Sequence, residues 1–347
     1  MTKLVFITQV VDPDDPNLGA SCAKIAALAR RVDDVVVVCD RGRADVLPDN
    51  CRLLTFGASS RPRRAARYVA AIRNAMRVRP DAVVAHMIPL YAIAAAPFAR
   101  PRGVPLMLWY THWKAHAVLR VGLAVCTHVL SVDERSFPVR SRKLHAIGHG
   151  IDLSEFPCQP AIPSNGRPLR VVALGRYAPP KKLDELIEGV RIARGRGVDA
   201  NIDVYGTTGA PMLDAYKQDL ERLVTQPGYE FASVDGAIPR TEVPTAYAHA
   251  DVVASDFDSA DKVVLEAGAS CRLVLASHAS FDRLFEGIEP PLSFERGRPE
   301  TFADRLQALA ALGDDERHAI GCTLRERVKA QHSVETWADA ILELAEA

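Results

Sequence analysis

Residues 251–277, DVVASDFDSADKVVLEAGASCRLVLAS, decide how the chain folds. Their pattern predicts a strand at Asp251–Ala254, a polar turn at Ser255–Ala260, a helix that begins at Asp261 and a second strand at Leu273–Ser277. In a parallel α/β sheet such a turn lies beyond the carboxyl end of the strand, and the free N–H groups of the next helix face it. The stretch therefore predicts an anion-binding site at the top of a sheet.

The predicted turn and helix are rich in carboxylates. Asp256, Asp258 and Asp261 lie within six residues, and Glu266 follows Asp258 by eight. Carboxylates stabilise any helix N-terminus, so capping by Asp258, Ser259 or Asp261 is an alternative to ligand binding. Glu266 lies in an apolar run, where a charge is costly unless it has a partner. A hydroxyl group of a bound ligand is one such partner.

Short apolar runs alternate with longer helical patterns along the whole chain. This rhythm is typical of buried parallel strands in doubly wound α/β layers. The runs form two sets, Leu4–Thr8, Val35–Cys39, Ala82–Ala85, Leu106–Trp109 and Thr127–Val132, then Leu169–Leu174, Asn201–Tyr205, Val252–Ala254 and Leu273–Ala276.

A segment rich in proline, residues 157–168, separates the two sets and is the natural linker. The sequence therefore predicts two Rossmann-like domains, at 1–156 and 169–331, that face each other across a cleft. Ligand sites in such sheets lie beyond the carboxyl ends of the strands. A terminal helix at 332–347, with Ser333 as its N-cap, has to bury Trp337, Ile341 and Leu344.

The composition indicates a globular protein of two ordinary domains. The chain has 347 residues, of which 48% are hydrophobic and 25% charged, with formal net charge zero, so charge gives no argument for a nucleic-acid partner. The seven cysteines contain no CxxC pair, which predicts reduced cytosolic thiols rather than a zinc site or a disulfide framework. The sequence predicts neither an export signal nor a membrane span of roughly 20 apolar residues.

The run 261–277 resembles the signature of family 4 retaining glycosyltransferases of the GT-B fold, in which two acidic residues eight apart close the donor-sugar site. Asp258 stands at the first acidic position, where that family usually has glutamate, and Glu266 at the second. The resemblance implies that Glu266 holds the donor ribose and that Asp258 orients the sugar. It covers most of the chain and is strongest at 106–156, 171–190 and 251–277.

Two cations, Arg176 and Lys181, follow the strand that ends at Leu174, which places them in the loop above the sheet. Two such cations can converge on one polyanion, and ordinary surface charge is the alternative. The resemblance implies that they hold the donor diphosphate, with no metal required. Lys182 stands where that family usually has glycine.

Several residues are expected beside the donor through the resemblance. The long first loop has no GxGxxG motif, which argues against a classical nicotinamide or flavin site. Gly19 in this loop and Gly206 in the 204–209 turn can equally serve ordinary turns. The residues expected beside the donor are Gly19, with its neighbours Asn17 and Ala20, and Gly206, Lys262 and Val263. The nucleotide base is expected near residues 234–236 and 247–251.

Histidines follow two predicted strands of the first domain. A histidine at the carboxyl end of a buried parallel strand points toward the cleft rim. The resemblance carries the family's sugar-contacting histidine to His112, whereas His86 and His116 are acceptor-side or structural residues. His149 lies between Gly148 and Gly150, which indicates a tight loop.

Residues 61–79 contain seven arginines and no acidic residue. With Tyr68, Val69, Ile72 and Met76 at helical spacing, they predict an amphipathic helix. Its cationic face is either simply solvated or docks on an anionic membrane surface. The second interpretation suits an enzyme that acts on a lipid-linked acceptor at the inner face of the membrane.

The sequence as a whole predicts a cytoplasmic retaining glycosyltransferase. It would move a sugar from a GDP- or UDP-linked donor to the hydroxyl of a sugar, lipid-linked or small-molecule acceptor, in polysaccharide, glycolipid or glycoside synthesis. No cofactor and no metal are expected. A sugar-nucleotide epimerase of the same fold and a non-catalytic nucleotide-binding homologue are the alternatives. The resemblance also implies that the terminal helix packs on the first domain.

Overall fold

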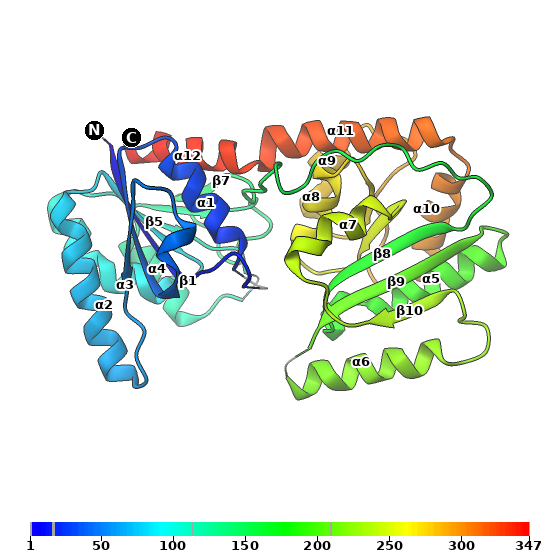
Figure 1. Ribbon diagram of the computed structural model, residues 1–347, viewed down its shortest axis with the longest axis horizontal. Coiled ribbons are helices and arrows are strands. Elements are labelled where there is room, and N and C mark those ends of the chain that lie inside the picture. The colour runs from blue at the N-terminus through cyan, green and yellow to red at the C-terminus, as the bar shows by residue number, and fades with distance from the viewer. Residues whose placement is uncertain (1, 16–17, 113, 209, 347) are drawn as a thin grey trace. The chain divides into compact units, whose positions relative to one another are not determined.

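The computed structural model describes residues 2–15, 18–112, 114–208 and 210–346. The chain forms two compact units, which are referred to as unit 1 (Met1–Asp152 and Gln331–Ala347) and unit 2 (Leu153–Ala330). Each unit is built on one parallel sheet with helices packed against it (Figure 1). Each is described by itself below.

Unit 1 contains a seven-stranded parallel sheet in the order β3-β2-β1-β4-β5-β6-β7. The first six positions follow the strand order of a dinucleotide-binding fold, whose switch point lies between β1 and β4. The strands are β1 (Lys3–Val11), β2 (Asp34–Gly42), β3 (Cys51–Thr55), β4 (Ala82–His86), β5 (Leu106–Trp109), β6 (His128–Ser131) and β7 (Leu144–Ala146).

The helices of unit 1 cover both faces of its sheet. They are α1 (Ala20–Ala29), α2 (Arg61–Ala75), α3 (Pro89–Ala99), α4 (Ala117–Val125) and α12 (Val334–Glu346), with 3-10 turns η1 (Ala44–Val46), η2 (Met76–Val78) and η3 (Arg100–Arg102). Lys143 fixes the end of α4, because its ammonium donates to the carbonyl oxygens of Leu123 at 2.9 Å and Cys126 at 2.7 Å.

Successive side chains of β1 point to opposite faces of the sheet, so the core of unit 1 has two halves. Val5 and Ile7 pack in the cluster that contains Tyr68 of α2. Phe6 points to the other face, where its ring centroid lies 6.4 Å from that of Trp337 in α12. Trp337 is fully buried, so α12 closes this face although it follows unit 2 in the sequence.

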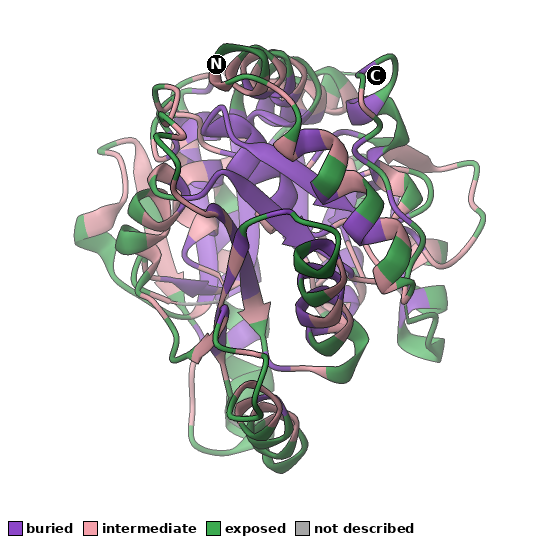
Figure 2. Cartoon of the chain, turned by 90° about the vertical axis from the view of Figure 1, so that its right-hand side faces the viewer, coloured by how far each residue is buried: buried purple, intermediate pink, exposed green. Residues whose placement is uncertain are grey.

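Unit 2 contains a five-stranded parallel sheet in the order β10-β9-β8-β11-β12. The chain proceeds outward from β8 in one direction and from β11 in the other, so the switch point lies between these two strands. Figure 2 shows these central strands as buried and the outer helix faces as exposed. The strands are β8 (Leu169–Arg176), β9 (Ala200–Thr207), β10 (Ala232–Asp235), β11 (Val252–Ser255) and β12 (Leu273–Ala276).

Helices flank the sheet of unit 2 in the same way. They are α5 (Leu183–Gly195), α6 (Pro211–Val224), α7 (Val243–Ala248), α8 (Lys262–Ala269), α9 (Asp282–Phe285) and α10 (Pro299–Ala310), with 3-10 turns η4 (Pro179–Lys181), η5 (Arg240–Glu242) and η6 (Ala279–Phe281). A long helix, α11 (Asp314–His332), runs from unit 2 into the part of the chain that belongs to unit 1.

All nine apolar runs form strands, and the fold class is as the sequence predicts. The terminal helix begins as expected, since the Ser333 hydroxyl accepts from the Thr336 N–H at 3.1 Å. Residues 61–75 form a helix, but Val69 is 39% exposed and does not join its buried side. Among the described residues, no helix combines the length and apolarity needed to cross a membrane.

One expectation about the cysteines is wrong. Cys158 and Cys271 form a disulfide within unit 2, instead of remaining reduced thiols. The residues are 113 positions apart in the sequence, and the fold brings their Cα atoms to 4.9 Å. Spacing along the chain therefore gave no sign of this pair.

Candidate functional site

The predicted acidic turn lies at the switch point of unit 2, between the end of β11 and the start of α8. Asp261 occupies the N-cap position of α8, but its side chain makes no capping hydrogen bond. Its carboxylate accepts instead from the Ser255 hydroxyl at 2.8 Å and pairs with the Lys181 ammonium. The first N–H groups of α8 therefore lack a side-chain cap and favour an anion.

Lys181 lies beneath this turn, and only 7% of the residue is exposed. Its Nζ lies 4.7 Å from the ring centroid of Phe257. A Cβ atom at Gly175 would lie 2.8 Å from that Nζ, so glycine leaves the space that Lys181 occupies. An ammonium group has three donors, so the pair with Asp261 leaves others for a ligand.

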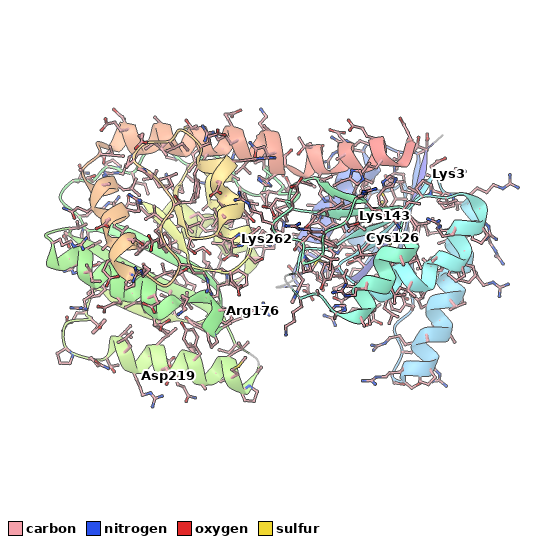
Figure 3. The ribbon with its side chains drawn as sticks, turned by 180° about the vertical axis from the view of Figure 1, so that it is seen from behind. Lys3, Cys126, Lys143, Arg176, Asp219 and Lys262 are labelled. Carbon is pink, nitrogen blue, oxygen red and sulfur yellow. A yellow bond between two sulfur atoms is a disulfide. The ribbon has the colours of Figure 1, made fainter. Side chains whose placement is uncertain are left out.

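Arg176 has different surroundings. It is exposed at the carboxyl end of β8. Its guanidinium makes no hydrogen bond or ion pair with any residue in the described part of the chain. Figure 3 labels Arg176 and also Lys262, which opens α8. The structure thus gives one cation that is buried and paired and another that is open to solvent.

Asp258 is half-buried in the turn before α8. Its Oδ1 is shielded from solvent and has no hydrogen-bond partner in residues 2–15, 18–112, 114–208 and 210–346. Neither Asp258 nor Ser259 is the N-cap of α8. A buried acceptor without a donor is unfavourable, so this oxygen is suited to a hydroxyl group of a ligand.

Glu266 is only 3% exposed, and the protein itself supplies partners for its charge. Its Oε1 lies 3.1 Å from Nη1 of Arg240 and 3.2 Å from Nζ of Lys262. The hydroxyl group of Tyr247 donates to Oε2 at 3.3 Å. Burial, and then the charge of Glu266, raise the pKa of Tyr247, which keeps this donor protonated.

Arg240 is a member of the site that the sequence reasoning missed. It opens η5 and also pairs through Nη2 with Oε2 of Glu155, at 2.5 Å. Arg240 follows a strand of the parallel sheet, which is the same signal that predicts Arg176. The signal is weaker because four residues separate it from the end of β10.

The residues at two predicted positions, Asp256 and Gly206, are explained by contacts within the protein and need no ligand. Asp256 is buried and accepts from the Ser277 hydroxyl at 2.7 Å and the Gly297 N–H at 2.9 Å, and burial raises its pKa. At Gly206 a Cβ atom would lie 2.7 Å from the Gly175 carbonyl oxygen. Packing against the neighbouring strand therefore accounts for glycine here.

The first turns of α5 and α8 hold two more residues of interest. Lys182 is the N-cap of α5 and has φ of 49°, the left-handed conformation that glycine adopts without steric cost. Lysine at this position therefore adopts a backbone conformation that favours glycine. Val263 is half-buried in the first turn of α8, next to Lys262.

Gly19 lies at the start of α1 in unit 1. Its N–H donates to the Asp15 carbonyl oxygen at 2.9 Å, and a Cβ atom would lie 2.4 Å from the Pro13 carbonyl oxygen. The loop itself therefore requires glycine and uses its amide, as the ordinary-turn interpretation has it. Ala20 is the first residue of α1, and Asn17 lies outside the described residues.

The three histidines after the strands of unit 1 have different environments. Nδ1 of His116 accepts from the Leu119 N–H at 3.1 Å and caps α4, a structural role. His86 is buried and stacked on Trp109 at 5.0 Å between centroids, and burial lowers its pKa well below the usual value. His112 is half-buried beyond β5, with Nδ1 accepting from the Lys114 N–H at 3.1 Å. Its role toward a sugar stays a prediction.

Comparisons with known proteins identify the architecture. The sequence matches no family model and no curated protein. Among solved structures, Anabaena HepE in complex with UDP and glucose matches with TM-score 0.76 and 16% identity over 100% of both chains. Sucrose-phosphate synthase from Thermosynechococcus elongatus matches with TM-score 0.76 and 16% identity over 100% of this chain and 98% of that one. A glycosyltransferase from Rickettsia africae matches with TM-score 0.77 and 13% identity over 99% and 98% of the chains.

These matches span both units, and the two Rossmann-like parallel sheets of seven and five strands agree with them. The chain has the GT-B fold.

Proposed function

We propose that this chain is a retaining glycosyltransferase that moves a sugar from a nucleotide-diphosphate sugar to an acceptor hydroxyl. The observation that carries the proposal is the set of groups at the β8–β11 switch point. Arg176 and Lys181 lie there with an uncapped helix N-terminus and an unpartnered oxygen of Asp258. Such a set fits a ligand that carries both a diphosphate and hydroxyl groups.

The chemical difficulty of the reaction is the departure of the diphosphate from the anomeric carbon. Negative charge develops on the leaving oxygen as that bond breaks. Arg176, the remaining donors of Lys181 and the first N–H groups of α8 would stabilise this charge, since preorganised donors need no reorganisation. These groups can perform the task without a metal ion, and we propose that the reaction requires none.

The carboxylates would orient the donor. Oδ1 of Asp258 can accept a hydrogen bond from a sugar hydroxyl without breaking any existing contact. Glu266 already has Arg240, Lys262 and Tyr247 as partners. A carboxylate has about four lone-pair sites, so a ribose hydroxyl can add to them. The network would then hold Glu266 in position for the ribose.

We propose the donor base from the ligands of a similar structure, and the acceptor from the arginines of α2. HepE is described in complex with UDP and with UDP-glucose, which favours a UDP-linked donor over a GDP-linked one. His112 is proposed to contact the transferred sugar. The arginines of α2 are proposed to meet anionic lipid headgroups, which fits a lipid-linked acceptor at the inner face of the membrane.

The first test is a thermal-shift panel with UDP, GDP, ADP and dTDP in the presence of EDTA. Selective binding raises the melting temperature by mass action, so one nucleotide should give a clear shift. Donor consumption and the anomeric configuration of the product are then followed by NMR, with retention expected. Consumption without an acceptor that yields an isomerised donor would indicate an epimerase, and binding without consumption would indicate a non-catalytic homologue.

Arg176→Ala tests the central role. We expect donor consumption to fall on the order of 10²-fold, because a charged stabiliser of the leaving group is lost. Arg222→Ala is the matched control, since that arginine is also exposed in unit 2 but lies on α6 and pairs with Asp219. Equal activity of the two variants and the wild type would contradict the proposal.

A further inference from the structure

Three side chains of unit 2, one of them joined to a fourth by a disulfide, meet at a place that the proposed reaction does not use. Cys158 of the linker is bonded to Cys271, which follows α8. Sγ of Cys158, a ring nitrogen of His318 and Sγ of Cys322 all lie within 4.8 Å of one another. The groups within this distance are two sulfur atoms and one imidazole, and the disulfide holds a third sulfur atom, that of Cys271, next to Cys158.

We propose that this cluster is a zinc site of the Cys3His type when the disulfide is reduced. Zinc binds thiolate sulfur at about 2.3 Å and imidazole nitrogen at about 2.0–2.1 Å in a tetrahedron, so sulfur and nitrogen ligands lie about 3.5 Å apart. Sγ of Cys322 and Nε2 of His318 are 3.5 Å apart. One edge of the tetrahedron is thus already in place.

The backbone around the cluster holds the ligands together. His318 and Cys322 are four residues apart on α11, so they lie on the same face of that helix. Gly321 lies between them, and a Cβ atom there would be 2.2 Å from the carbonyl oxygen of Cys271. Any other residue would push α11 away, so glycine keeps the helix against the third ligand.

The environment of the individual groups also fits a metal site. Cys271 is buried, with φ of 57°, and directs the chain back toward β12. Cys158 is exposed, so reductant and metal can reach the cluster. Nε2 is the ring nitrogen of His318 that faces Cys322, which leaves Nδ1 to carry the proton of the neutral ring.

The chemistry balances with a thiol or phosphine reductant. Two electrons and two protons break the bond between Cys158 and Cys271 and leave two thiols. Binding of Zn²⁺ then displaces the protons of these two thiols and that of Cys322, while His318 binds in its neutral form. The disulfide and the metal are therefore alternative cross-links that join the linker to the end of α8, and only the metal also joins α11.

No spacing in the sequence indicates this site, because its ligands are at positions 158, 271, 318 and 322 and include no CxxC pair. Short ligand spacings are what make a zinc site readable from sequence. Here the only local spacing is the i,i+4 pair on α11. The tertiary structure brings the other two ligands to it.

Co²⁺ binding to the reduced full-length chain tests the proposal, because Co²⁺ bound by thiolates gives charge-transfer and d–d absorption bands. We expect one Co²⁺ per chain, displaced by one Zn²⁺, and no binding before reduction. Cys322→Ser and His318→Ala should each weaken binding at least tenfold. The control Cys51→Ser removes a half-buried thiol of unit 1 and should leave binding unchanged.

A second measurement needs no variant. Alkylation of the reduced wild type, read by mass spectrometry, should show that Zn²⁺ protects Cys158, Cys271 and Cys322 but not Cys51. Reduced protein that binds neither Co²⁺ nor Zn²⁺, or a pattern of alkylation that Zn²⁺ does not change, would overturn the proposal. Metal binding that is insensitive to both Cys322→Ser and His318→Ala would also overturn it.

Discussion

Asp258 has a carboxylate oxygen that is unfavourable for the protein alone, because it is shielded from solvent and no donor in the described segments reaches it. We expect Asp258→Asn to lower donor consumption on the order of 10²-fold. The melting temperature should stay equal or rise, since a desolvated charge is removed. Asp258→Glu should recover part of the activity. Parallel loss of melting temperature and activity would contradict a binding role.

Substitution of Glu266 should lower the stability of the protein, in contrast to substitution of Asp258. Its carboxylate balances Arg240 and Lys262, so Glu266→Gln leaves two cations without their buried partner. We expect a loss of about 3–5 kcal/mol in the free energy of unfolding, measured by circular dichroism in urea. Adding Arg240→Met should recover part of that loss. If Glu266→Gln unfolds like the wild type, the network does not stabilise unit 2.

At this scale the sequence predicted that the polar groups after β8 and β11 lie close together, because polar groups after parallel strands gather at one edge of a sheet. It did not predict how they pair. Lys181 follows β8 and Asp261 is the N-cap of α8, so their ion pair joins residues 80 positions apart and depends on how the two elements pack. The pairing of Arg240 with Glu266 likewise depends on how two separate elements, η5 and α8, pack together.

Two glycines in helices make a matched test of packing at the scale of the element. Gly321 of α11 faces the Cys271 carbonyl oxygen, whereas Gly195 at the end of α5 has no atom within 4 Å of a Cβ position. Gly321→Ala should destabilise unit 2 by about 1–3 kcal/mol through overpacking. Gly195→Ala should stabilise it by about 0.5–1 kcal/mol. Thermal unfolding followed by circular dichroism distinguishes them, and shifts of the same sign would contradict the close contact.

Two edge strands of unit 1 were not predicted from apolar runs in the sequence. Strands β3 and β7 are the two edges of the sheet in unit 1, and they lack a continuous apolar run. An edge strand is only partly buried, so its residues need not be apolar on both faces. The central strands are fully buried, which is why hydrophobic runs located them.

Stability of the whole molecule should depend on pH through His332, which is buried at the junction of α11 and α12. Burial lowers its pKa to about 4, although the charge of Asp133 acts in the opposite direction. The unfolded chain binds this proton from about pH 6.5 downward and the folded chain only near pH 4, so stability falls as pH falls between these values.

We expect unit 1 to lose about 2 kcal/mol between pH 7.5 and pH 5 from His332 alone. Trp109 and Trp337 are buried in unit 1, so the change in tryptophan fluorescence in urea at pH 7.5 and pH 5 reports on this unit. His332→Phe should flatten the dependence. An equal loss in this variant would assign the effect to other groups, such as the buried His86.

The place of α12 in unit 1 also bears on the order in which the protein is made. Unit 2 is one uninterrupted stretch, whereas unit 1 needs residues that the ribosome adds only after all of unit 2. At about 5–20 residues per second, that interval lasts roughly 10 to 40 s. During it Phe6 and its neighbours lack the cover of Trp337, so apolar surface of the nascent unit 1 stays exposed to water. The unit that is synthesised first is therefore the last to be completed.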